Sequence, residues 1–383
     1  MKGKKTVLIF TDWYLPGYKA GGPITSLANM IRNLSNYFNF KIVCRDTDYT
    51  DADPFDNVVS DEWNKVGEAQ VRYLSTNNLN YSRISGLIKE TNPDVVYVTG
   101  FFSKVFSIFP VLAARKYRVI LSPRGMLAEG ALGIKTSKKK LFLAIAGRVS
   151  AYKKIFWHAT NEAEAEQVLA FFPKAKVGVA PNFPGISTAK TELKKPKIKG
   201  ELRLYSVARV APEKNLDFAL NCLKQIPSTV RVSLKIIGSI YDRAYFQKLE
   251  SIKHQLNDSV SVDFLGPIPQ KEIGEIAKES DFFFLPTLGE NYGHAIIEAM
   301  LMGIPVLISN KTPWTSLDVK SLGFDLPLVE DLFAKRIIDL ANMGADEYQS
   351  KYSNVNQKAE KLIDFQNISQ AYLALFNDSN RSE

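Results

Sequence analysis

The sequence has few of the residues that build disulfide frameworks and metal clusters. Among its 383 residues are two cysteines and three histidines. Cys44 and Cys222 lie far apart in apolar surroundings and match neither a disulfide-framework spacing nor a zinc-site spacing. We therefore expect two buried free thiols, a reducing compartment and no metal site. His294 also lacks the second histidine, four residues away, that a metalloprotease helix requires.

Long apolar runs are missing as well. No stretch approaches the roughly 20 apolar residues of a membrane-spanning helix. The start, MKGKKTVLIFTDWY, is basic and then apolar, but its apolar run is only a strand long and lacks a cleavage site. The sequence thus predicts a cytoplasmic protein without a signal peptide.

Basic residues are in excess, with 49 Lys and Arg against 40 Asp and Glu and a net charge of +9. Such an excess suits an anionic partner such as a nucleotide, a phosphorylated substrate or anionic lipid. The lysines are scattered and no nucleic-acid-binding motif is present, so nucleic acid is not an expected partner. Residues 134–158 mix lysines with apolar residues. They indicate either peripheral contact with the inner membrane surface or an ordinary helix with a basic outer face.

Short β-rich runs alternate with helical patterns in two series, which predicts an α/β protein with two doubly wound domains. The predicted strands are 6–10, 40–44, 94–99, 118–122 and 176–180, then 202–208, 232–238, 260–266, 281–286 and 305–309. Residues 183–200 are rich in Pro, Gly and Lys and are predicted to link a domain of residues 1–182 to one of residues 201–363. The last helix, about 364–383, has an apolar face that must pack against another part of the protein.

Candidate binding residues follow the first strand of each series, where ligands bind in doubly wound sheets. Gly21 and Gly22 precede a helix whose free backbone N–H groups could bind a phosphate, although a plain turn is the alternative. Arg209 and Lys214 flank a turn that contains Pro212. Two cations there suit a diphosphate, and the alternative is a solvated basic loop.

The stretch LGENYGHAIIEAM, residues 288–300, places Glu290 in a loop and Glu298 about one turn inside the helix that follows. Gly293 between them lets a ligand approach the backbone, and the helix dipole favours an anionic group there. The two glutamates could be a catalytic pair, a clamp on one ligand or simply part of a helix start. Their loop-then-helix placement favours a clamp that addresses two parts of one ligand.

These motifs together resemble the retaining glycosyltransferase family 4. The resemblance spans nearly the whole chain, and its most specific part is the pair Glu290 and Glu298 with seven residues between them. SPRGML (122–127) and TPW (312–314) are similar to a branch that serves capsule or exopolysaccharide assembly. The resemblance implies a GT-B fold, in which two Rossmann-like doubly wound domains face a central cleft and the C-terminal domain holds most of the donor. It further implies that the last helix, about 364–383, crosses back and packs on the N-terminal domain.

The resemblance also implies roles for individual residues. Arg209 and Lys214 would bind the donor diphosphate and, with Glu290, carry the catalysis. Glu298 would hold the ribose, and Glu290 would address the transferred sugar. The remaining donor-binding residues would be Gly21, Gly22, Gly266, Asn291, Tyr292 and Gly293. The donor would be UDP- or GDP-linked, and neither a metal nor a cofactor is expected.

Two features depart from the family pattern. Many members carry an N-terminal-domain histidine near the acceptor, but Arg124-Gly125 stands where it is expected, which makes Arg124 a candidate contact to the acceptor or a phosphate. His158 is the other acceptor-side candidate, unless it is a strand-end histidine bonded to backbone. Residues 45–56 contain two Asp-x-Asp patterns. In GT-A transferases these bind a metal, but here the donor motifs lie mostly in the other half, which favours an acidic loop.

The sequence therefore predicts a metal-independent, retaining hexosyltransferase that moves a sugar from a nucleoside-diphosphate sugar to an acceptor alcohol. The acceptor would be a glycan or lipid-linked glycan of a bacterial capsule, exopolysaccharide or O-antigen. The alternatives are a GT-B phosphorylase or epimerase, and a catalytically silent sugar-nucleotide-binding protein.

Overall fold

The chain folds into two α/β units, each built on one sheet. The computed structural model describes residues 3–127, 142–143, 146–147, 149–185 and 196–377. One unit comprises Met1–Phe183 with Asp364–Glu383, and the other comprises Pro184–Ile363. We call them the N-terminal and C-terminal domains and describe each by itself.

The N-terminal domain is built on an eight-stranded sheet with the order β3-β4-β2-β1-β5-β6-β7-β8. Its neighbouring strands run parallel, except for the antiparallel pair β3 and β4. The strands are β1 (Lys5–Phe10), β2 (Phe38–Arg45), β3 (Trp63–Val66), β4 (Ala69–Leu74), β5 (Val95–Thr99), β6 (Arg118–Ser122), β7 (Phe156–Ala159) and β8 (Lys176–Val179). The sequence analysis did not predict β3, β4 and β7. Strands β3 and β7 are only four residues long, whereas β4 has the polar–apolar alternation of a half-buried strand and was predictable from it.

The C-terminal domain has a six-stranded, all-parallel sheet with the order β11-β10-β9-β12-β13-β14. Its strands are β9 (Glu201–Val207), β10 (Arg231–Ile237), β11 (Val260–Gly266), β12 (Phe282–Leu285), β13 (Val306–Ser309) and β14 (Gly323–Leu326). Strand β12 is buried along its whole length, as its four consecutive apolar residues predict for the centre of a parallel sheet.

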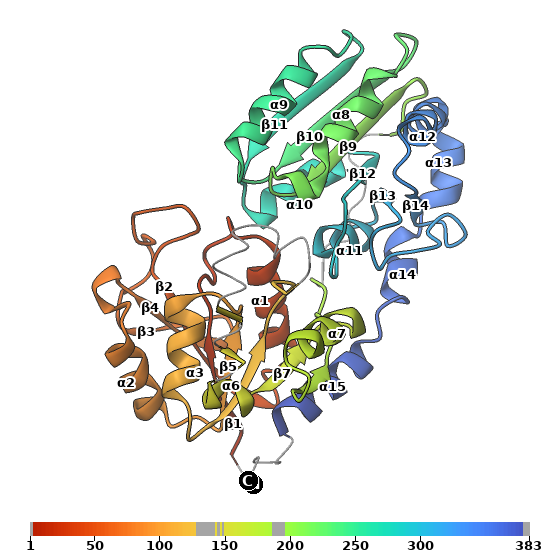
Figure 1. The fold of residues 1–383 in the computed structure, drawn as a ribbon. Helices are drawn as coiled ribbons and strands as arrows, with labels where there is room; N and C mark the ends of the chain where they lie inside the picture. Colours follow the sequence, from red (N-terminus) through yellow and green to blue (C-terminus); the bar gives the residue numbers. More distant parts are fainter. Residues whose placement is uncertain (1–2, 128–141, 144–145, 148, 186–195, 378–383) are drawn as a thin grey trace. The chain divides into compact units, whose positions relative to one another are not determined.

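Helices connect the strands of each sheet (Figure 1). In the N-terminal domain the described helices are α1 (Gly22–Leu34), the 3-10 turn η1 (Thr76–Asn78), α2 (Tyr81–Thr91), the π-helical turn η2 (Lys104–Ile108), α3 (Phe109–Ala113), α6 (Ser150–Lys153), α7 (Glu162–Phe171) and α15 (Phe365–Asn377). In the C-terminal domain they are the 3-10 turn η3 (Pro212–Lys214), α8 (Leu216–Lys224), α9 (Arg243–Lys253), α10 (Gln270–Lys278), α11 (His294–Leu301), α12 (Glu330–Asn342), α13 (Ala345–Tyr352) and α14 (Val355–Glu360). Alternating strands and helices around parallel sheets confirm the predicted α/β class and its two Rossmann-like domains.

Helix α15 is distant in sequence from the rest of the N-terminal domain, yet it completes that domain's core. The Tyr372 ring stacks on Phe183 with centroids 5.3 Å apart, and Phe376 meets Phe38 edge to face at 5.3 Å. Arg118 donates a hydrogen bond of 2.8 Å to the Leu375 carbonyl. These contacts bury the apolar face that the sequence pattern of the helix shows.

Both cysteines are buried free thiols, Cys44 in β2 and Cys222 in α8. Burial raises the pKa of each thiol, because it disfavours the charged thiolate. They are structural rather than reactive groups.

Candidate functional site

The C-terminal domain brings together two loops that are 70 residues apart in sequence, and both follow the carboxyl ends of neighbouring strands β9 and β12. The amide of Asn215 donates to the Pro286 carbonyl at 2.9 Å. The Leu288 N–H and the Thr287 hydroxyl both donate to the Glu213 carbonyl, each at 3.1 Å. Hydrogen bonds between the two loops therefore satisfy polar backbone groups of both, and they fix the position of each loop relative to the other.

An ion pair crosses between these loops. The Lys214 ammonium lies 2.6 Å from a carboxylate oxygen of Glu290, and the two side chains are only 17% and 14% exposed. The structure thus brings together two of the predicted site residues from distant parts of the chain. It also shows them bonded to each other, which the sequence did not predict.

Arg209 lies on the same side of the sheet but remains open to solvent. Its guanidinium stands 5.0 Å from the Tyr241 ring centroid and 3.3 Å from the Glu213 carboxylate, and its side chain is 41% exposed. The ring supports one face of the planar cation, and the N–H groups that do not contact Glu213 are available for an anion.

Trp314 holds the loop that carries Glu290. Its indole N–H donates to the Tyr292 carbonyl at 2.6 Å, and its ring meets the Tyr292 ring edge to face at 5.5 Å. Gly293 is the N-cap of α11 and has a φ of 75°. A Cβ there would lie 3.2 Å from the Trp314 nitrogen and 3.0 Å from Ile296. The TPW motif therefore has a structural role, which its sequence resemblance alone did not reveal.

Glu298 has different neighbours from Glu290. It lies in the middle of α11, near the phenols of Tyr205 and Tyr292. Burial raises the pKa of both phenols, and the negative charge of Glu298 raises it further. Glu290 is instead paired with a cation. The two glutamates thus occupy chemically distinct environments.

Glycines allow the ends of β9, β10 and β11 to converge below Arg209. Gly238 has a φ of 150°, and a Cβ at this position would lie 2.1 Å from the Ala208 carbonyl oxygen. Its N–H donates to the Gly266 carbonyl at 2.9 Å, and Gly266 itself has a φ of 70°. The sequence analysis selected Gly266 but missed Gly238, whose only signal was a glycine at the end of an apolar strand.

In the N-terminal domain, Gly21 caps α1 with a φ of 72°, and Gly22 is the first helical residue. The preceding loop is held by Asp48, whose carboxylate accepts from the Tyr18 N–H at 2.9 Å and the Lys19 N–H at 3.2 Å. Diphosphate binding by Gly21 and Gly22 stays a prediction.

The Asp-x-Asp region is a loop whose carboxylates bond to residues outside it. Asp46 accepts a hydrogen bond of 2.8 Å from Ser60, and Asp51 pairs with Lys19 at 2.6 Å. Within the described residues, no three His, Cys, Asp or Glu side chains are grouped so that they could hold a metal ion.

Arg124 and His158 belong to one buried polar network. The Arg124 guanidinium donates to the Tyr97 hydroxyl at 3.0 Å, to Ser26 at 2.9 Å and to Asn182. His158 Nε2 lies 2.8 Å from the Ala180 carbonyl, which can only accept, so Nε2 carries the proton and Nδ1 accepts from Tyr97 at 2.8 Å.

This network places His158 in the interior of the domain. Its side chain is fully buried, and burial followed by the positive charge of Arg124 lowers its pKa to about 3. These contacts match the alternative to an acceptor-side role, in which His158 is a strand-end histidine hydrogen-bonded to the backbone. The acceptor-side roles of Arg124 and His158 stay predictions.

The predicted basic segment 134–158 lies largely outside the described residues, apart from its end around α6. No helix in the described part of the chain is both long and apolar enough to cross a membrane.

Comparisons with known proteins identify similar glycosyltransferases. Residues 188–319 match the family model of glycosyl transferases group 1. This match contains both loops of the site. An uncharacterized protein of the cps region of Klebsiella pneumoniae is 26% identical over 265 residues, which are 63% of this chain and 69% of that protein. An uncharacterized glycosyltransferase of Methanocaldococcus jannaschii is 28% identical over 29% of this chain and 27% of its own length.

Solved structures share the fold over nearly the whole chain. Anabaena HepE in complex with UDP and glucose has a TM-score of 0.69 at 14% identity, covering 98% of this chain and 100% of that one. WaaG, a glycosyltransferase of lipopolysaccharide biosynthesis, has a TM-score of 0.66 at 11% identity, covering 97% and 99%. The fold is therefore GT-B, and the family match supports a glycosyltransferase.

Proposed function

We propose that this protein is a retaining, metal-independent glycosyltransferase of family 4. It would move a hexose from a nucleoside-diphosphate sugar to an acceptor alcohol during the synthesis of a bacterial surface polysaccharide. The observation that carries the proposal is the Lys214–Glu290 pair, which joins the cation-bearing loop after β9 to the glutamate-bearing loop after β12.

The pair suggests how the donor would enter. In the absence of a ligand, Glu290 neutralises Lys214. A diphosphate offers Lys214 a doubly charged partner, and Glu290 is then free to accept hydrogen bonds from sugar hydroxyls. Arg209, supported on Tyr241, adds a second cation for the diphosphate. Glu298, which lies inside α11 near Tyr205 and Tyr292, is proposed to accept hydrogen bonds from the ribose. The N–H groups of residues 291–293 would serve the sugar and phosphates at the start of that helix.

The chemistry needs stabilisation of a leaving group rather than a pair of acid and base carboxylates. The bond between the anomeric carbon and the diphosphate oxygen breaks, and negative charge develops on the diphosphate opposite Lys214 and Arg209. The acceptor oxygen then bonds to the anomeric carbon from the same face, and its proton passes to the departing phosphate. Two cations within the protein supply the charge stabilisation that other transferases take from a divalent metal.

The relatives are consistent with this pathway. The HepE structure contains UDP and glucose, WaaG acts in lipopolysaccharide biosynthesis, and the Klebsiella relative is encoded in a cps region. A UDP- or GDP-linked sugar is the proposed donor, and a glycan or lipid-linked glycan is the proposed acceptor.

The test is a panel of UDP, GDP, ADP and CMP sugars, with nucleotide release measured with and without acceptor glycans. Acceptor-stimulated release with retained anomeric configuration is the expected result, and it should survive EDTA. Lys214→Ala should reduce turnover by about 100-fold, as loss of one charge-stabilising group does in other enzymes. Lys248→Ala is the matched control, because it removes a lysine of the same domain that pairs with Asp217 instead. Binding of a sugar nucleotide without turnover by any acceptor would refute the transferase assignment.

A further inference from the structure

Asn215 departs from two local preferences at the point where the Lys214 turn meets helix α8. Its backbone is left-handed, with a φ of 57° and a ψ of 38°, a region that asparagine tolerates but that residues other than glycine seldom occupy. It is also the N-cap of α8, where an asparagine side chain normally accepts a hydrogen bond from the first turn, yet it makes no such bond. Departures of this kind concentrate at functional sites, and they indicate another use of the side chain.

The start of α8 is capped from another helix instead. The Asp217 N–H, in the first turn of α8, donates to the Tyr245 hydroxyl of α9 at 3.0 Å. The same hydroxyl donates back to the Asp217 carboxylate at 2.6 Å. An N-terminal N–H group of α8 is thus satisfied without Asn215, and the asparagine side chain is available for a different partner.

That partner is the end of the neighbouring strand. The Asn215 amide donates to the carbonyl of Pro286, which directly follows β12, at 2.9 Å. Pro286 is buried, so the bond satisfies a backbone group that would otherwise lack a partner near the interior. Asn215 directly follows Lys214, and Glu290 lies four residues after Pro286. The bond therefore closes a short path between the two members of the Lys214–Glu290 ion pair.

The loop at the far end of this path is itself held in place by the next strand of the sheet. The Thr287 carbonyl accepts a hydrogen bond of 2.5 Å from the hydroxyl of Ser309 in β13, and both residues are fully buried. Two residues beyond Gly289's neighbour Leu288, the Glu290 N–H donates to the Lys311 carbonyl at 3.2 Å. The glutamate-bearing loop is therefore fixed to β13, and Asn215 fastens the cation-bearing turn to that fixed loop.

We propose that Asn215 is a positioning residue, which holds Lys214 where its ammonium faces the diphosphate that leaves the sugar. This inference rests on the proposed transferase function. A lysine side chain is long and flexible, so the location of its charge depends on where its backbone is held. A misplacement of about 1 Å at a catalytic centre can cost about 100-fold in rate. One hydrogen bond at the base of Lys214 can therefore control turnover without touching the ligand.

Two substitutions remove this bond in different ways. Asn215→Gly deletes the side chain and fits the left-handed backbone. Asn215→Asp keeps the shape of the side chain but replaces the donor with a carboxylate oxygen, which repels the Pro286 carbonyl. The control for the backbone is Asn92→Gly, because Asn92 is also left-handed, with a φ of 44°, and is exposed at the end of α2.

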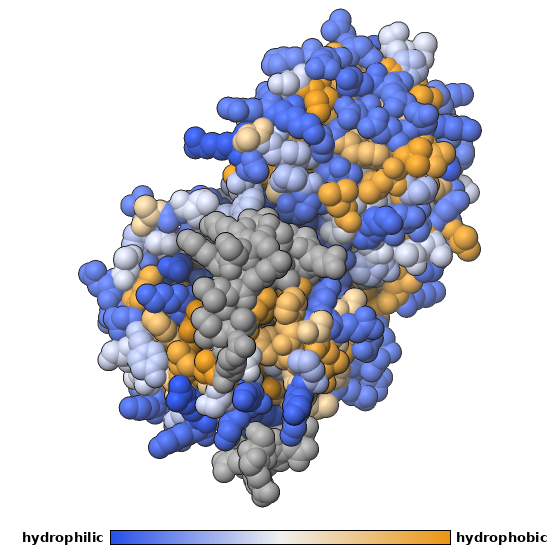
Figure 2. All heavy atoms as spheres, in the orientation of Figure 1, coloured by the Kyte–Doolittle hydropathy of each residue, from blue (hydrophilic) through white to orange (hydrophobic). Residues whose placement is uncertain are grey.

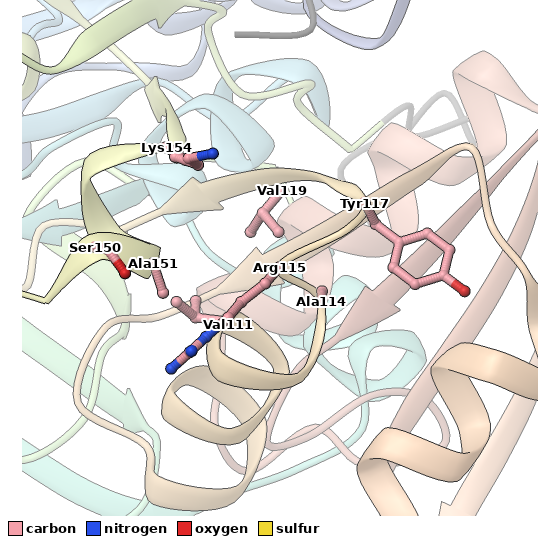
Figure 3. A pocket seen from close by; sticks show the side chains of 8 residues that line it. All are labelled: Val111, Ala114, Arg115, Tyr117, Val119, Ser150, Ala151 and Lys154. Carbon is pink, nitrogen blue, oxygen red and sulfur yellow. The ribbon is translucent and has the colours of Figure 1, made fainter. Parts of the chain in front are cut away.

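The control for charge is Arg115→Gln, which lowers the net charge by one, as Asn215→Asp does. Arg115 is exposed in the N-terminal domain and lines a cavity of about 140 Å³ beside α3 (Figure 3). The surface of this domain mixes hydrophilic and apolar residues in the view of Figure 2. The loss of one charge there leaves a surface of the same mixed character.

The first measurement needs no ligand. A double-mutant cycle of Lys214→Gln and Glu290→Gln in urea unfolding gives the coupling energy of the ion pair, both in the wild type and in Asn215→Gly. We expect Asn215→Gly to reduce this coupling energy by about half or more. The midpoint of urea unfolding should stay nearly unchanged, because the ease of glycine at positive φ offsets the lost hydrogen bond. Asn92→Gly should leave the coupling energy unchanged.

The second measurement is turnover by the full-length protein with the nucleotide sugar and acceptor that the wild type uses. Both Asn215 variants should lower kcat by about 10-fold and change KM by less than about two-fold, because the misplaced charge acts on the transition state. In a Lys214→Ala background, Asn215→Gly should cause no further loss, since it acts through Lys214. Asn92→Gly and Arg115→Gln should leave kcat unchanged.

An unchanged coupling energy in Asn215→Gly, or an unchanged kcat, would overturn the proposal. An undiminished effect of Asn215→Gly in the Lys214→Ala background would also overturn it, because Asn215 would then act on another group. A wild type that binds nucleotide sugars without turnover would refute the transferase assignment, and the coupling energy alone would then decide the role of Asn215. A retained coupling energy would contradict that role, and a halved one would support it.

Discussion

The Lys214–Glu290 ion pair should contribute measurably to the stability of the C-terminal domain. The perturbation is a double-mutant cycle with Lys214→Gln, Glu290→Gln and both changes together. Exposed ion pairs contribute about 0.2–1 kcal/mol, whereas removing one partner of a buried pair costs about 3–5 kcal/mol. At 2.6 Å, with side chains 17% and 14% exposed, this pair lies between those limits. We expect a coupling energy of about 2 kcal/mol.

The measurement should report on the domain that contains the pair. Trp314 is the one tryptophan of the sequence between 184 and 363. In fluorotryptophan-labelled protein, its fluorine NMR signal therefore follows urea unfolding of the C-terminal domain in the intact chain. The matched control is the Arg231–Glu201 pair of the same sheet, which is longer at 3.4 Å and more exposed at 80% and 35%. Its coupling energy should be below about 0.5 kcal/mol.

The same cycle separates structural support from donor binding. A ligand at 100 times its Kd stabilises a protein by about 2.7 kcal/mol. Added UDP should give at least this stabilisation in Glu290→Gln, because Glu290 is proposed to contact the sugar, which UDP lacks, and its carboxylate no longer competes for Lys214. The stabilisation should be largely lost in Lys214→Gln, because the diphosphate loses its cation. A coupling energy as small as that of the Arg231–Glu201 control would refute the inference that the two loops are joined by this pair.

Three further predictions follow from the described contacts. Trp314→Phe removes the indole N–H that bonds the Tyr292 carbonyl but keeps an aromatic ring. We expect the free energy of unfolding in urea to fall by about 1–2 kcal/mol and the donor to bind more weakly by calorimetry. Unchanged donor affinity would mean that the bond does not position the loop. Gly238→Ala places a Cβ against the Ala208 carbonyl and should destabilise the domain by about 2 kcal/mol or more. Its control is Gly274→Ala on α10, where an added Cβ meets no atom within 4 Å, and this change should be neutral or stabilising by up to about 1 kcal/mol. His158 has a pKa of about 3 in the folded state and 6.5 in the unfolded state, so the unfolded state binds more protons between these pH values. The free energy of unfolding should therefore fall by about 1.4 kcal/mol per pH unit as pH decreases through that window. Urea titrations at pH values of about 5 and 7 should show that His158→Gln removes this pH dependence.

The alternation of strands and helices was readable from the sequence because parallel strands are buried on both faces. Runs such as those of β5 and β12 are continuously apolar, so composition alone indicates them. Strand β3 is not fully buried at any residue and pairs antiparallel at the edge of the sheet. Its stability comes from pairing with β4, and a pairing partner leaves no local signal in either strand.

The candidate site was predictable for its charged residues and not for their partners. Lys214 and Glu290 stood out because each follows a buried strand, where parallel sheets place ligands. That they bond to each other depends on β9 and β12 being neighbours in the sheet. Sequence order alone does not show this adjacency, because β10 and β11 intervene along the chain. It follows from the Rossmann strand order 3-2-1-4-5-6, which this sheet has.

The separate environments of Glu290 and Glu298 bear on why both are glutamates. The Glu290 carboxylate pairs with Lys214, and another anion that takes this cation would release it. The Glu298 carboxylate lies on α11 near two buried phenols, and its negative charge raises the pKa of Tyr205 and Tyr292. Replacing Glu290 by Gln should therefore change how the empty site is held together as well as how it binds sugar. Replacing Glu298 by Gln should leave the Lys214 loop in place and weaken only the binding of ligands that carry a ribose.

Calorimetry with pyrophosphate, which has neither sugar nor ribose, distinguishes the two variants. The affinity for pyrophosphate should rise in Glu290→Gln, because a competing anion is gone. It should stay unchanged in Glu298→Gln. Equal changes in both variants would mean that the two carboxylates act as one anionic cluster rather than as two separate contacts.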